Sequence, residues 1–114
     1  MTIHLSDSSS DSDQDLWENE MVYLTPNQIW VKPSYKTCIL INASITVRPE
    51  NFNEAHGIVQ CIYDNQTITI CSLFPQKPSQ KIQIAWGPDQ NMRFINTGNH
   101  PVTLALLIKT LSIL

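Results

Sequence analysis

Residues 102–109 read Val-Thr-Leu-Ala-Leu-Leu-Ile-Lys, a stretch that predicts a β-strand with apolar side chains on both faces. Every second residue of the strand is apolar, which places one row on one face of a sheet: Val102, Leu104, Leu106 and Ile108. A strand with one solvated face would not need Leu107 as well. The strand therefore lies centrally in a buried sheet or faces another subunit, and we favour the second. The candidate subunit-interface residues are Leu104, Leu106 and Leu107.

Seven more candidate strands precede this one, and turns containing Pro, Asn, Asp and Gly separate them. The expected ranges are 16–23, 28–32, 36–47, 57–63, 67–73, 80–86, 91–97 and, for the last strand, 101–109. Alternating apolar residues within a strand are expected to share one face, as in the row Ile39, Ile41, Ala43, Ile45 and Val47. No segment shows a sustained helical period. Eight short strands predict an all-β fold, an antiparallel jelly-roll sandwich.

The composition of the chain changes abruptly near residue 20. Residues 1–20 hold no Lys or Arg but contain six carboxylates: Asp7, Asp11, Asp13, Asp15, Glu18 and Glu20. Residues 21–114 hold seven basic and four acidic side chains. The first 15 residues carry too few apolar side chains to offset the entropy of ordering, so we expect a disordered acidic arm at 1–15 and a β-domain at 16–114. Such an arm suits a cationic partner.

Three serines of the arm fit the pattern that acid-directed kinases recognise. Ser8, Ser10 and Ser12 each have an aspartate three residues downstream. Each phosphate would add a charge of about −1.5 to −2 and would strengthen the negative field of the arm. The alternative is a solvated spacer that nothing modifies.

The sequence offers no group of residues arranged for catalysis. The histidines at 4, 56 and 100 have no metal-binding spacing, and no Gly-rich phosphate loop or nucleophile turn is present. Cys38, Cys61 and Cys71 form neither a disulfide framework nor a zinc motif. We therefore expect a non-enzyme with no catalytic residues, no metal, no cofactor and no small-molecule substrate.

The charge and hydropathy of the chain bear on two further classes of partner, nucleic acids and membranes. Seven dispersed basic residues do not indicate sequence-specific nucleic-acid binding. No stretch approaches the 18 apolar residues of a membrane span, and no secretory signal is visible, so no membrane partner is expected. Three unpaired cysteines fit a reducing compartment, the cytoplasm or the nucleus.

The order of these elements resembles the nucleoplasmin-like family. The segments that carry the resemblance are Leu16-Trp17 with Glu20-Met21, Trp30-Val31-Lys32-Pro33, Thr69-Ile70-Cys71-Ser72-Leu73 and Gly98-Asn99-His100-Pro101-Val102. The resemblance spans about residues 16–108. It implies a ring-shaped homopentamer, or a decamer of two rings, in the nucleus. It also implies a histone chaperone that shields core histones, and the six carboxylates would then be the histone-binding residues.

The chain departs from the family in lacking an acidic tract after the core, an isomerase domain and a basic nuclear-localisation cluster. Two other interpretations stay open. One is a catalytically inactive dUTPase-like trimer that recruits PDZ domains through Ser112-Ile113-Leu114. The other is a viral structural protein built on a jelly roll. Both share the all-β fold, so the number of subunits would distinguish them.

Overall fold

The computed structural model describes residues 17–48, 50 and 54–110, and strands dominate this part of the chain. The strands are β1 (Trp17–Leu24), β2 (Ile29–Val31), β3 (Lys36–Ser44), β4 (Gly57–Tyr63), β5 (Gln66–Leu73), β6 (Ser79–Trp86), β7 (Met92–Asn96) and β8 (Val102–Thr110). They confirm the eight expected strands in order and position. The third strand ends at Ser44, three residues earlier than expected.

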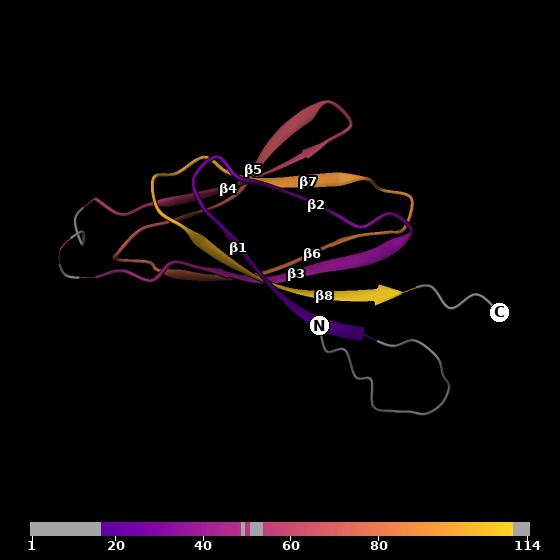
Figure 1. The fold of residues 1–114 in the computed structure, drawn as a ribbon, viewed down its shortest axis with the longest axis horizontal. Coiled ribbons are helices and arrows are strands. Elements are labelled where there is room, and N and C mark those ends of the chain that lie inside the picture. Colours follow the sequence, from indigo (N-terminus) through magenta and orange to yellow (C-terminus); the bar gives the residue numbers. More distant parts are fainter. Residues whose placement is uncertain (1–16, 49, 51–53, 111–114) are drawn as a thin grey trace.

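The strands form two four-stranded antiparallel sheets that face each other (Figure 1). Sheet A has the order β1-β8-β3-β6, and sheet B has the order β2-β7-β4-β5. All connections except the β4–β5 hairpin pass from one sheet to the other. This is the winding of a jelly roll, and it confirms the expected fold class. Strand β8 lies centrally in sheet A, between β1 and β3.

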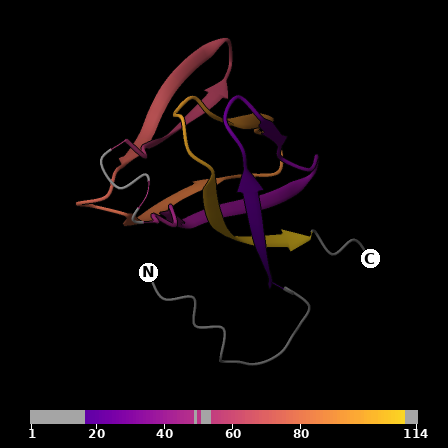
Figure 2. The same cartoon turned by 60° about the vertical axis from the view of Figure 1, so that its left-hand side comes forward.

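Turn residues explain where the chain reverses. Asp64 and Asn65 both have positive φ angles, 55° and 62°, as a two-residue type I′ hairpin requires. Asn27, with φ 67°, follows Pro26 in the turn that links β1 to β2, where Gln28 N–H donates to the Thr25 carbonyl. The β4–β5 hairpin projects beyond the two layers (Figure 2).

The core lies between the inner faces of the sheets. The row at Val102, Leu104, Leu106 and Ile108 shares one face of β8, as expected, and that face is buried in the core. Phe94 of β7 anchors the opposite side, stacked on Trp30 at 5.7 Å and edge-on to Trp86 at 5.2 Å between ring centroids. Such aromatic pairs add about 0.5–1.5 kcal/mol each beyond their area burial.

The expectation for the apolar row of β3 is wrong, because a β-bulge interrupts the strand. The pairing of β3 with both neighbours shifts between Leu40 and Asn42. Against β8 these two residues pair with the adjacent Leu106 and Ala105, so Ile41 is the extra residue of β3 there. Before the bulge Leu40 faces the core and Ile39 faces outward. After it, Ala43 is buried in the core. One inserted residue therefore reverses the alternation of β3: even-numbered residues face the core before the bulge, and odd-numbered residues face it afterwards.

A single buried amide, that of Asn96, connects three parts of the sandwich. Its side chain donates to the carbonyls of Leu24 at 3.0 Å and His100 at 2.8 Å. Its carbonyl oxygen accepts from the N–H groups of Gly98 at 2.9 Å and Ile58 at 3.4 Å. Asn96 has no exposed surface. The end of β1, the start of β4 and the β7–β8 turn are thus held together by one residue.

The β7–β8 turn fits against β4 only because residue 98 is glycine. A Cβ atom there would lie 2.4 Å from the His56 carbonyl oxygen and 2.7 Å from the Gly57 Cα. Both neighbours are backbone and cannot rotate away. The same approach lets Asn99 accept from His56 N–H at 2.9 Å and donate to the Glu54 carbonyl at 2.8 Å.

We expect Asn96→Ala to lower the free energy of unfolding by about 3 kcal/mol or more, because it removes four hydrogen bonds of a fully buried side chain. The exposed Asn91, at the end of the β6–β7 turn, supplies the control. Asn91→Ala should change the value by less than about 0.5 kcal/mol. Urea unfolding followed by tryptophan fluorescence measures both. Equal stability of the two variants would contradict the role given to Asn96.

Candidate functional site

One end of the sandwich gathers carboxylates that belong to the strands and their turns. We name it the acidic end and define it by Glu18, Glu20 and Asp89. Both glutamates are exposed on β1, paired with Ile108 and Leu106 of β8. Their side of the strand faces the interior, but the edge strand of the opposite sheet, β2, has only three residues and leaves them uncovered. Asp89 is exposed in the β6–β7 turn.

Trp17, the first described residue, begins β1 at this end, and residues 1–15 precede it in the sequence. The described residues hold six carboxylates and seven basic side chains, which leaves them close to neutral. Residues 1–15 add four carboxylates and no Lys or Arg. Three lysines share this end: Lys32, Lys36 and Lys109, the last with its ammonium 5.6 Å from the centre of the Trp17 ring. Among the described residues, the three lysines therefore balance the three carboxylates that define the acidic end.

Lys32 is buried, which the sequence did not lead us to expect. It is 2% exposed, and its ammonium donates to the carbonyls of Pro33 at 3.0 Å and Lys36 at 2.7 Å. Burial lowers the pKa of Lys32, while the nearby Cys38 and Asp89 act to raise it. The alternation of side chains along a strand could have indicated this burial. Lys32 lies two residues after the inward-facing Trp30, which puts both side chains on the same face.

The interface candidates separate onto two faces of β8. Leu104 and Leu106 are 0% and 1% exposed, because they point between the sheets, so their assignment to a subunit interface is corrected. Leu107 has the opposite parity and is half-buried on the outer face of sheet A. It lies between Asn19 of β1 and Ile39 of β3.

The outer face of sheet A is largely apolar around Leu107. Met21 and Tyr23 of β1 are 67% and 63% exposed. They pair with Ala105 and Thr103 of β8, beside Leu107. The sheet A patch consists of the apolar and aromatic residues Met21, Tyr23, Ala105 and Leu107, together with Ile39. The sheet face would normally be polar if it met only water.

A second apolar surface covers the outer face of sheet B. Ile29 and Val31 of β2 are 45% and 62% exposed. They pair with Ile95 and Arg93 of β7, which pair in turn with Gln60 and Ile62 of β4. We call the aliphatic residues among these the sheet B patch: Ile29, Val31, Ile62 and Ile95. The two patches lie on opposite sides of the sandwich and have different compositions.

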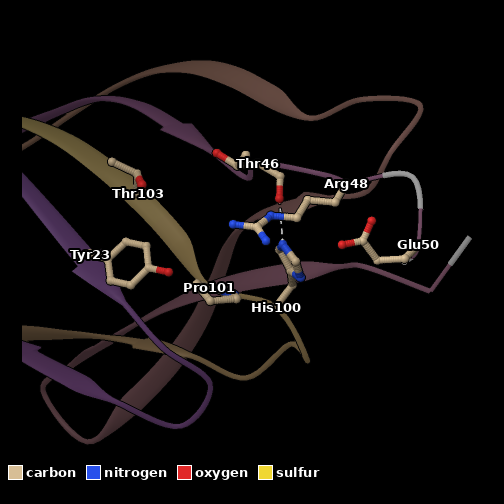
Figure 3. A pocket seen from close by; sticks show the side chains of 7 residues that line it. All are labelled: Tyr23, Thr46, Arg48, Glu50, His100, Pro101 and Thr103. Carbon is tan, nitrogen blue, oxygen red and sulfur yellow. Dashed lines mark hydrogen bonds between the residues drawn. The ribbon is translucent and has the colours of Figure 1, made fainter. Parts of the chain in front are cut away.

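A hollow of about 470 Å³ opens at the other end of the molecule, where β1 ends and β8 begins. Figure 3 shows the Arg48 guanidinium between the Tyr23 ring and His100, with the Glu50 carboxylate beside them. The His100 Nε2 lies 2.7 Å from the Thr46 carbonyl oxygen. Arg48 and Glu50 give the hollow mixed charge, and its lining contains no cysteine or serine nucleophile.

The cysteine thiols lie in the core. Burial raises the pKa of Cys38 to about 12 and that of Cys71 to about 11, and burial raises the pKa of Cys61 as well. Their thiolate forms are therefore suppressed near neutral pH. Within the residues that the structure describes, no group of three His, Cys, Asp or Glu side chains could hold a metal ion. That part of the chain also contains no helix long and apolar enough to cross a membrane.

Comparison with known proteins agrees with this geometry. A family model described as the nucleoplasmin-like domain matches residues 4–105. The chain belongs to the nucleoplasmin-like family. The match covers most of the chain and confirms the resemblance found in its strand order. A search of curated protein sequences found no match.

Solved nucleoplasmin-like structures share the fold at low sequence identity. The nucleoplasmin-like N-terminal domain of Drosophila FKBP39 has a TM-score of 0.70 and 8% identity, over 90% of this chain and 97% of that one. The Drosophila NLP core has a TM-score of 0.66 and 13% identity, over 83% and 98%. The latter structure is described as giving insight into pentamer formation and histone binding.

Several candidate residues lie outside the described part of the chain. They are the arm carboxylates Asp7, Asp11, Asp13 and Asp15, the serines Ser8, Ser10 and Ser12, and the C-terminal Ser112, Ile113 and Leu114. The division into an arm at 1–15 and a domain from 16 also stays a prediction. Of the six histone-binding candidates, the structure places Glu18 and Glu20.

We expect the three thiols to be unreactive in the folded protein. With a pKa of about 12, Cys38 is a thiolate in roughly one molecule in ten thousand at pH 8. Because the shifts are upward, reactivity should increase only as the pH approaches these raised values. Ellman's reagent should therefore react with all three thiols in urea but with none over the same time in buffer. A thiol that reacts within seconds in the native protein would contradict this.

Proposed function

We propose that the protein is a histone chaperone that assembles as a ring-shaped homopentamer and shields core histones with its carboxylates. The observation that carries the proposal is the concentration of six carboxylates in residues 1–20, without Lys or Arg, in a chain that belongs to the nucleoplasmin-like family. The similarity to the Drosophila NLP core, whose structure concerns pentamer formation and histone binding, supports it. We propose a binding role without catalysis, in the nucleus.

The two apolar patches support assembly into a ring. A domain of this size buries only about 60–70% of its unfolded surface, so covering further apolar surface stabilises it. A closed ring built head to tail requires two different surfaces on each subunit. The sheet A patch and the sheet B patch meet this requirement, since they lie on opposite faces and differ in composition.

The carboxylates explain the preference for a basic partner. Each chain offers the six carboxylates of residues 1–20, so five chains would present about thirty around one ring. Concentrated carboxylates attract Lys- and Arg-rich proteins and compete with DNA phosphates for them. Phosphorylation of Ser8, Ser10 and Ser12 would increase this charge. None of the described contacts favours the trimeric adaptor or the viral structural protein.

We expect Leu107→Asp to dissociate the assembly, because a carboxylate in a dry subunit contact is costly. Native mass spectrometry should give five copies for the wild type and one for the variant. The control is Gln76→Asp, an exposed residue in the β5–β6 connection. It should leave five copies. If the Leu107→Asp variant is still a pentamer, the sheet A patch is not part of the subunit interface.

We expect removal of residues 1–15 to weaken binding of core histones by about ten-fold or more at about 150 mM salt, since four carboxylates per chain are lost. Glu18→Gln with Glu20→Gln should weaken it further. Fluorescence anisotropy with labelled core histones measures the affinity, and native mass spectrometry checks that the ring stays intact. An intact ring whose affinity is unchanged would show that the arm does not bind histones.

A further inference from the structure

We propose that the free edge of β5 pairs with β5 of a second copy of this chain, as two antiparallel strands related by a two-fold axis. The contact lies near the tip of the β4–β5 hairpin, at Thr67 and Thr69. It uses a sheet edge rather than the outer faces that carry the two apolar patches. The inference therefore goes beyond the proposed ring and does not depend on histone binding.

The two described sheets have four edge strands, and three of them are protected against pairing with another chain. Strand β1 carries Glu18 and Glu20, and β2 has only three residues. Strand β6 carries Lys81, and its pairing with β3 is irregular beside that residue. Charged side chains, short length and bulges are the usual means by which proteins keep sheet edges from pairing with other chains.

Strand β5 lacks this protection near the hairpin tip. Residues 66–73, Gln-Thr-Ile-Thr-Ile-Cys-Ser-Leu, contain no charged residue, Pro or Gly. Its pairing with β4 is irregular at Ile70, which leaves residues 66–69 as a regular stretch. These residues are all exposed, and the hairpin projects beyond the two layers (Figure 2). An uncharged, exposed edge rich in Thr and Ile can act as a template for another strand.

The two-residue turn at the hairpin tip fixes which backbone groups the edge offers. The residues that flank such a turn form a hydrogen-bonded pair, here Tyr63 and Gln66. Hydrogen-bonded pairs alternate with non-bonded pairs along antiparallel strands. The N–H and carbonyl groups of Thr67 and Thr69 are therefore directed away from β4, toward the free edge.

The sequence of this stretch matches itself in antiparallel orientation. When Ile68 lies opposite the second copy's Ile68, each Thr67 lies opposite a Thr69, and the outward backbone groups of both strands meet. This register gives about four backbone hydrogen bonds, with threonine pairs on one face of the joined sheet. Ile68 is 52% exposed, although its partner on β4, Cys61, is buried. The second copy would cover this apolar side chain.

Charges at the two ends of β5 favour a second copy as the partner. Asp64 is exposed at the hairpin tip, before the strand begins. Lys77 is exposed at the other end, where two backbone hydrogen bonds of 3.2 and 2.8 Å hold it beside Phe74. Antiparallel pairing brings opposite ends of the two strands together, so each Asp64 is placed toward the second copy's Lys77. A two-fold axis makes the same attraction occur twice.

The test measures hydrogen exchange of the Thr67 and Thr69 amides in the full chain at protein concentrations from about 1 µM to 1 mM. A contact of about four hydrogen bonds is weak by itself, so it forms only toward the upper end of this range. We expect exchange of both amides to slow about two-fold or more there, while the amides of edge strand β6 stay unchanged. Equal slowing at both edges would indicate non-specific aggregation and would overturn the proposal.

Thr67→Pro is the decisive variant, because proline removes an N–H that points to the free edge and leaves the bonds to β4 in place. The concentration dependence at Thr69 should then disappear. Thr67→Val is the matched control, since it keeps both the N–H and the β-branched shape, and it should behave like the wild type. Concentration-dependent slowing that persists in Thr67→Pro would contradict strand pairing.

Lys77→Glu tests the antiparallel orientation without a change in the hairpin turn. It places like charges together and should weaken the concentration dependence. Adding Asp64→Asn removes the repulsion, and asparagine accepts the positive φ of 55° at this position. The double variant should therefore pair more strongly than Lys77→Glu alone. Equal behaviour of the two would show that these ends do not meet.

Histone titrations of the same proteins keep this inference separate from the proposed function. A wild type that binds histones but shows no concentration dependence at β5 would refute the strand pairing alone. A wild type that shows the dependence but binds no histones would refute the chaperone alone. Slowing at Thr67 and Thr69 that requires added histones would assign the edge to that partner and overturn self-pairing.

Discussion

The buried Asn96 amide is the constraint on which this sandwich depends. It joins the end of β1, the start of β4 and the β7–β8 turn through four hydrogen bonds to backbone groups. Moving a backbone N–H or carbonyl group out of water without a hydrogen bond costs free energy. The bonds to Asn96 therefore favour one arrangement of the three segments. Gly98 makes the approach sterically feasible. Because this turn leads directly into β8, the amide also fixes where the central strand of sheet A begins.

The small size of the domain explains the character of its surfaces. Strand β8 contributes to both sides of sheet A, with Leu104 and Leu106 in the core and Leu107 on the outer face. Two thin sheets cannot cover their own outer faces, and both carry exposed aliphatic side chains. A single chain therefore fills its core but leaves two apolar patches exposed, and the proposed self-association would cover them.

The acidic end combines stabilising and destabilising features. Lys32 closes the β2–β3 corner, although an ammonium must be buried to do so, and Tyr35 keeps a left-handed backbone with its ring in solvent. A sequence selected for stability alone would place an apolar residue at 32 and glycine at 35. Departures of this kind from local rules tend to occur where a protein binds its partner.

The sequence alone determined the eight strands, their turns and the shared face of the Val102–Ile108 row, because alternation and turn chemistry depend on residues close in the chain. Only the tertiary structure decided which face each strand presents. The bulge at Ile41 reversed the parity of β3, and Leu104 and Leu106 lie in the sandwich interior. The burial of Lys32 and the four bonds of Asn96 were likewise decided there. These features depend on partners far apart in the sequence, which local periodicity cannot specify.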